Sequence, residues 1–179
     1  MIGSISALLA IPAVGAAMVF WVLFWTGKGE AYGPLNDVAV AAALFLIIAP
    51  ALAISGTSPP DFPWLPLLGW AAVAGMVIAG AGQLLLVVRV IGLNGSFVTG
   101  GIGILPVLIW MAVLAYAGIV RGAPSASIGW TAALVLALIV PAAVTARGSK
   151  RVALIWQSIL VAALMAWLAA VALHLGQLG

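Results

Sequence analysis

The stretch AAALFLIIAPAL, residues 41–52, contains no charged side chain and no side chain that can form a hydrogen bond. It lies in an apolar run over residues 37–55. A run of about 20 residues is what a helix needs to cross roughly 30 Å of hydrocarbon at 1.5 Å per residue. Comparable runs cover residues 6–25, 67–90, 100–120, 128–146 and 152–174. The sequence therefore predicts six transmembrane helices.

The composition supports a membrane environment. Hydrophobic residues make up 66% of the 179 residues and charged residues 5%, with a mean hydropathy of +1.37. A soluble surface needs about a quarter of its residues charged. Membrane-spanning strands would alternate in polarity, whereas these runs are apolar on every side. We therefore expect an all-α, polytopic transmembrane helix bundle that forms a single domain over residues 1–179.

The connections between the predicted helices are short and rich in glycine and proline, as in GKGEAYGPLND at residues 27–37. Connections on one side of the membrane hold most of the basic residues: Lys28, Arg89, Arg147, Lys150 and Arg151. Because basic connections tend to stay in the cytoplasm, that side is predicted to be cytoplasmic and both termini to lie outside. Compactness and short connections favour a bacterial inner membrane, with an organelle membrane as the alternative.

A pattern recurs at an offset of 91 residues. AAALFLIIAPAL at residues 41–52 resembles AALVLALIVPAA at residues 132–143, so that Pro50 falls on Pro141. Copies separated by three spans would cross the membrane in opposite directions, which is typical of inverted repeats. The half-repeats would be residues 1–91 and 92–179. An accidental match within an alanine-rich chain is the alternative.

Two stripes of small residues follow the same offset. The first comprises Ala71, Gly75, Ala79 and Gln83, and the second comprises Ala162, Ala166, Ala170 and His174. Small side chains at four-residue steps let transmembrane helices approach closely, so Gln83 and His174 are expected to face other helices. Each is a candidate for an interhelical hydrogen bond or a ligand contact. His174 is so near the chain end that contact with interfacial water is an alternative to ligation of a metal, haem or pigment.

Asp37 and Arg89 form a second pair of candidates. Asp37 opens the second predicted helix and Arg89 closes the third, so both arrive at the same membrane face in an antiparallel hairpin. Charged groups near hydrocarbon usually pair or reach toward water, which predicts an ion pair between them. Capping of the second helix by Asp37 is the alternative.

Catalytic groups are scarce. The chain has no cysteine, one histidine and three acidic residues, which leaves no thiol nucleophile, no two-histidine metal site and no adjacent carboxylates within the membrane. Hydroxyl residues in the spans, such as Ser6 and Ser55, are expected to bond to the preceding turn of their own helix. Prolines in the spans free a carbonyl that needs another donor. We expect no enzymatic activity, no cofactor and no bound metal.

Two functions remain. The first is a non-catalytic accessory or structural subunit of a larger membrane assembly, with membrane lipids and other membrane subunits as partners. The alternative is a small transporter or substrate-binding membrane subunit, in which Gln83, the prolines and His174 surround a cavity for an apolar or lipid-like molecule. Nucleic acid is not an expected partner, because the basic residues are scattered and form no basic stripe.

Overall fold

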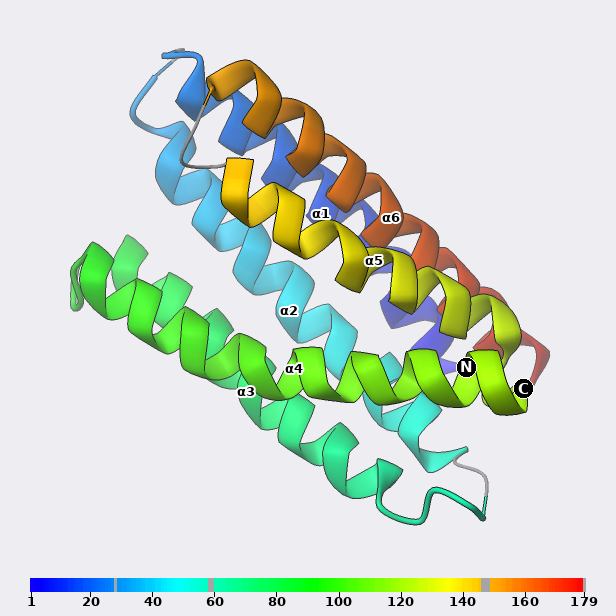
Figure 1. Cartoon of the computed structure of the whole chain (residues 1–179). Helices are drawn as coiled ribbons and strands as arrows, with labels where there is room; N and C mark the ends of the chain where they lie inside the picture. The colour runs from blue at the N-terminus through cyan, green and yellow to red at the C-terminus, as the bar shows by residue number, and fades with distance from the viewer. Residues whose placement is uncertain (28, 58–59, 146–148, 179) are drawn as a thin grey trace.

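The computed structural model describes residues 1–27, 29–57, 60–145 and 149–178. Within these residues the chain forms six α-helices and no strand (Figure 1). They are α1 (Ile2–Trp25), α2 (Tyr32–Gly56), α3 (Leu65–Val87), α4 (Leu93–Arg121), α5 (Ala126–Thr145) and α6 (Lys150–Gln177). Lys28 and Arg147, which contribute to the predicted orientation, lie outside the described residues.

The predicted fold class is confirmed. Each of the six helices is long and apolar enough to cross a membrane. The protein is therefore an integral, multi-pass membrane protein. The predicted starts of two helices were wrong, because α2 begins at Tyr32 instead of residue 37 and α4 begins at Leu93 instead of residue 100. Glycine and proline are tolerated in a first helical turn, so both helices extend through polar sequence beyond the apolar run.

The helices form a closed ring. Each packs against its neighbours in the sequence, and α1 also packs against α6. A smaller contact between α2 and α6 crosses the ring and divides its interior. Figure 1 shows α4 meeting α5 at the end of the bundle that carries both termini and diverging from it toward the other end. Helices α4 and α5 are thus in contact over only part of their length.

Glycines allow the closest contacts between helices. A Cβ atom added to Gly118 of α4 would lie 2.6 Å from the Cα atom of Gly129 of α5. Between α3 and α4, a Cβ atom added to Gly75 would collide with the carbonyl oxygen of Gly103, and one added to Gly103 would lie 2.8 Å from the Cβ atom of Ala79. The middle of the first predicted stripe is therefore a helix–helix contact, as expected for small residues in lipid.

The prediction for the second stripe was wrong for its first half, whereas Ala170 packs against the core and His174 is partly buried. Ala162 and Ala166 of α6 are exposed on the outside of the bundle. The face that α6 buries instead carries Trp167, Leu168 and Val171. Large side chains on that face fill the ring interior, and the buried apolar area they contribute exceeds what a row of alanines offers.

Four prolines lie inside helices: Pro12, Pro50, Pro106 and Pro141. Pro50 cannot donate to the carbonyl of Leu46, four residues earlier. Ser6 of α1 donates its hydroxyl to that carbonyl. The carbonyl that Pro50 leaves free therefore has the donor that was expected, and this hydrogen bond connects α1 with α2.

The predicted local bonds of hydroxyl residues are confirmed for Thr131, Thr145 and Ser158, but not for Ser6. Its expected bond to its own helix was wrong, because the nearest unsatisfied acceptor belongs to α2. A buried carbonyl without a donor is costly in hydrocarbon. An interhelical bond at this position therefore stabilises the fold more than a second bond within α1 would.

Candidate ligand-binding site

Three of the four candidate residues lie together. Asp37, Gln83 and Arg89 line one cavity of about 640 Å³, which we call the charged cavity. It is formed by the C-terminal ends of α1 and α3 and the N-terminal ends of α2 and α4. Its remaining polar side chains are Asn36 and Ser96. Its aromatic walls are Trp21, Phe24, Trp25 and Phe97.

The expected ion pair between Asp37 and Arg89 is not present in the structure. Within the described residues the pair that comes within 4.0 Å is Arg121 with Asp61, at 3.8 Å on the exposed surface. Asp37 instead accepts a hydrogen bond from Nδ2 of Asn36 at 3.2 Å. The charged cavity separates the two residues, because it lies between the α1–α2 and α3–α4 hairpins that carry them.

The alternative assignment of Asp37 as a helix cap was also wrong. The N-cap position of α2 is Ala31, and no side chain there forms a capping hydrogen bond. Asp37 lies in the second turn of the helix, where the backbone N–H groups already have partners within the helix. Its carboxylate is therefore free to face the cavity.

Arg89 has an unusual backbone conformation. Its φ angle is 61°, in the left-handed region, directly after the end of α3. The N–H of Val90 bonds to the carbonyl of Leu85 at 2.9 Å, and the N–H of Arg89 bonds to that of Leu86 at 3.0 Å. This is the Schellman arrangement, in which glycine is normally found at the position of Arg89. Because an arginine occupies a position where glycine would avoid backbone strain, its side chain is a candidate for a functional role.

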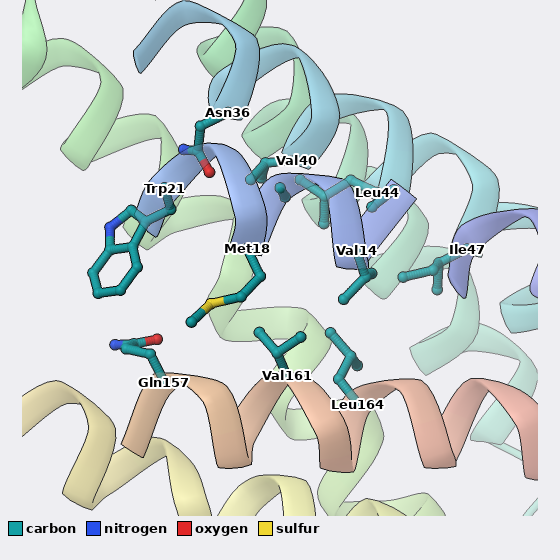
Figure 2. A pocket seen from close by; sticks show the side chains of 12 residues that line it. Val14, Met18, Trp21, Asn36, Val40, Leu44, Ile47, Gln157, Val161 and Leu164 are labelled. Carbon is teal, nitrogen blue, oxygen red and sulfur yellow. The ribbon is translucent and has the colours of Figure 1, made fainter. Parts of the chain in front are cut away.

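A second cavity, of about 320 Å³, lies between α1, α2 and α6, and we call it the middle cavity (Figure 2). It shares Trp21 and Asn36 with the charged cavity. Figure 2 shows these two residues with Gln157 at one end. Aliphatic side chains, including Val14 and Ile47, line the other end. The polarity therefore falls along the cavity.

The third cavity, of about 340 Å³, is lined only by apolar and aromatic side chains, and we call it the apolar cavity. It shares Leu44, Ile47 and Leu164 with the middle cavity. Helices α2 to α6 all contribute to its walls. Its wall includes side chains of α4 and α5, and one of them, Ile104, is 41% exposed.

Two tryptophans close the apolar cavity. The rings of Trp110 and Trp167 are perpendicular, with centroids 6.0 Å apart. The Nε1 atom of Trp110 donates to Oγ of Ser55 at 2.9 Å, and Gly69 leaves the room that this serine needs. Ser55 thus bonds to another helix, and its expected bond to the preceding turn was wrong. The Nε1 atom of Trp110 thus has a partner, whereas that of Trp167 is buried and has none among the described residues.

The three cavities follow one another along α2. Asn36 stands at the start and Ile47 at the last shared wall. At 1.5 Å per residue, the distance between these residues along the helix is about 16 Å. This is roughly half of a hydrocarbon core of about 30 Å. The series therefore covers about half of a hydrocarbon core along α2, and its polar side chains lie toward the Asn36 end.

Comparison with protein-family models, curated proteins and solved structures finds no match. The function must be argued from the site.

His174 lies at the other end of the molecule, away from the charged cavity. It lines a cavity of about 240 Å³ with Ser125, Ser127 and Gln177. Its Nε2 atom is buried and has no hydrogen-bond partner among the described residues. The residues that the structure describes contain no cluster of three or more histidine, cysteine or acidic residues that could hold a metal ion. Interfacial water and a ligand both remain predictions for this histidine.

The sequence reasoning missed Asn36, Ser96 and Gln157. Asn36 and Ser96 lie just before the apolar runs that begin at residues 37 and 100, so they were not included in a predicted span. Gln157 offered a usable signal, because it lies well inside the span predicted over residues 152–174 and is strongly polar. The two buried tryptophans gave no comparable signal, because tryptophan is common in membrane helices.

Proposed function

We propose that this integral membrane protein binds an elongated amphipathic molecule, such as a lipid, and acts as a substrate-binding subunit or small transporter for it. The polar end of the molecule occupies the charged cavity, and its chain occupies the middle and apolar cavities. The protein does no chemistry on the molecule in this proposal, and its interior side chains serve for recognition.

The observation that carries the proposal is the order of the three cavities. Polar and charged side chains gather in the cavity at one membrane face, and the cavity near the bilayer centre has none. Each cavity shares residues with the next. Pockets for small molecules commonly measure 300–1,000 Å³ and combine apolar walls with a few polar groups. This series has that composition, with the two kinds of lining separated along one axis.

The proposal is tested by photo-crosslinking. A phospholipid with a diazirine at the end of its acyl chain is added to the purified protein in mild detergent, and the labelled peptides are identified by mass spectrometry. We expect labels on residues that line the apolar cavity, such as Met111 and Val135. Labels confined to exposed residues on the outside would contradict the proposal.

A pair of substitutions on α5 sharpens the test. Val135 lines the apolar cavity and is 4% exposed, whereas Val140 is 66% exposed. Val135→Phe places a ring in the cavity and should abolish labelling there. Val140→Phe adds the same ring to the outer surface and should leave labelling unchanged. Both variants should keep the melting temperature of the wild type in detergent, because the cavity has room for the added ring.

A second candidate function is that of an accessory subunit in a larger membrane assembly. The observation that favours it is the exposed position of Ala162 and Ala166, one turn apart on the outside of α6. Small residues at this spacing are typical of surfaces through which transmembrane helices associate. Native mass measurement after mild extraction distinguishes the two functions. A stoichiometric complex that Ala162→Leu disrupts would support the accessory role, whereas an isolated chain with retained lipid would support ligand binding.

A further inference from the structure

We infer that the charged cavity recognises a zwitterionic lipid head group, with its ammonium group at Asp37 and its phosphate at Arg89. This inference rests on the proposed binding of an amphipathic molecule and names the chemistry of its polar end.

The first argument is the charge balance of the cavity. Asp37 and Arg89 face one space, yet no ion pair within 4.0 Å joins them in the described part of the chain. Asp37 is half-buried, and among the described residues its side chain accepts a hydrogen bond from Asn36 alone. A half-buried charge within a membrane-spanning helix is costly unless it has a partner. A zwitterion provides a partner for both residues, whereas a purely anionic head group would be repelled by Asp37.

The second argument is that hydrogen-bond donors that suit a phosphate line the same cavity as Arg89. Ser96 is 7% exposed and lines the cavity. It lies in the first turns of α4, a 29-residue helix that has no side-chain cap at its N-terminus. Unpaired N–H groups and the helix dipole at such an end favour an anion. A guanidinium, a hydroxyl and a helix N-terminus together suit a phosphate.

The third argument concerns the ammonium group. The walls of the cavity include Trp21 and Trp25, whose ring faces attract cations. Trp25 already interacts with a cation, because Nζ of Lys150 lies 5.9 Å from its ring centroid. Trp21 also borders the middle cavity. A head group that contacts Trp21 would therefore lie next to the middle cavity, which is proposed to hold the acyl chain of the same lipid.

The test compares two diazirine lipids with identical chains, phosphatidylethanolamine and phosphatidylglycerol, mixed in equal amounts with the purified protein. We expect the wild type to favour the zwitterionic lipid by about tenfold in labelling of the apolar cavity, the effect of one well-placed charge contact. Asp37→Asn should remove this preference. Equal labelling of the wild type by both lipids would overturn the inference and leave the proposed function intact, since the chains would still bind.

Substitutions of Arg89 provide the second arm. Arg89→Gly removes the guanidinium and places glycine at a left-handed position that glycine prefers, so the fold should be retained. Labelling by both lipids should fall, because both carry a phosphate. Arg121→Gln removes a charge from the exposed ion pair with Asp61 and is the matched control, for which no change is expected. Unchanged labelling of Arg89→Gly would overturn the assignment of the phosphate.

A third arm separates a lipid head group from a free zwitterion. Glycerophosphoethanolamine has the same head group and no acyl chain. It should fail to compete with the labelled lipid at a hundredfold excess, because the chain contributes most of the buried apolar area. Full competition by the free compound would show that the cavity binds a water-soluble zwitterion and would overturn recognition of a lipid.

Discussion

At the scale of single residues, two positions differ from what their local sequence favours. Arg89 stands where glycine would relieve the backbone, and Ser6 bonds to a neighbouring helix instead of its own. Neither could be predicted from the sequence, because a backbone angle and an interhelical contact depend on where other helices lie. The grouping of Asp37 with Arg89 could be predicted, since the ends of an antiparallel hairpin meet at one face. Their direct pairing could not, because it depends on the spacing between two hairpins.

The hydrogen bond of Ser6 leads to a prediction about Pro50. Ser6→Ala leaves the Leu46 carbonyl without a donor and should lower the free energy of unfolding by about 1 kcal/mol. In a Pro50→Ala background the residue at position 50 can donate to that carbonyl, and the same serine substitution should then cost little. The measurement is a double-mutant cycle of thermal unfolding in detergent.

Ser158→Ala is the control for this cycle, because Ser158 is exposed and its hydroxyl bonds to Leu154 of the same helix. Its effect should be small and the same in both backgrounds. An equal cost of Ser6→Ala with and without Pro50 would show that the serine does not compensate for the proline.

At the scale of helices, the number and type of elements could be predicted because the thickness of hydrocarbon sets the length of an apolar run. Their contact faces could be predicted only in part. The stripe at Gly75 and Ala79 packs against α4, whereas the stripe at Ala162 and Ala166 faces outward. A periodic pattern shows that residues share a face, but it does not show what the face meets.

The crossing of α4 and α5 gives a prediction at this scale. Gly118→Ala places a methyl group against the backbone of Gly129, so the helices must separate and the protein should lose about 1–3 kcal/mol of stability. Gly15→Ala is the control, because a Cβ atom at Gly15 of α1 would meet nothing within 4 Å. That change should be neutral or stabilising by up to about 1 kcal/mol. Thermal unfolding of both variants is the measurement, and an equal response would contradict the close approach.

At the scale of the whole molecule, the ring of six helices brings both termini to one end, as an even number of spans requires. Helix α1 closes the ring against α6, and α2 contacts α6 inside it. These contacts could not be predicted, because a single sequence does not show which distant helices pack together. The inverted repeat of residues 1–91 and 92–179 stays a prediction.

The orientation in the membrane can be measured directly, because the natural chain has no cysteine. A cysteine at Leu178 should react with a membrane-impermeant maleimide in intact cells, since both termini are predicted to lie outside. A cysteine at Ser149, beside Lys150, should react only after the cells are permeabilised. The reverse pattern would place the charged cavity at the external face and would contradict the orientation predicted from the basic residues.

In the proposed function, the partial contact of α4 with α5 would affect how fast a bound lipid exchanges with the bilayer. Such a lipid would enter the apolar cavity between these helices from the surrounding leaflet, without passing through water. Its arrival rate should then follow the fluidity of the surrounding bilayer, and remain indifferent to the amount of that lipid dispersed in the aqueous phase.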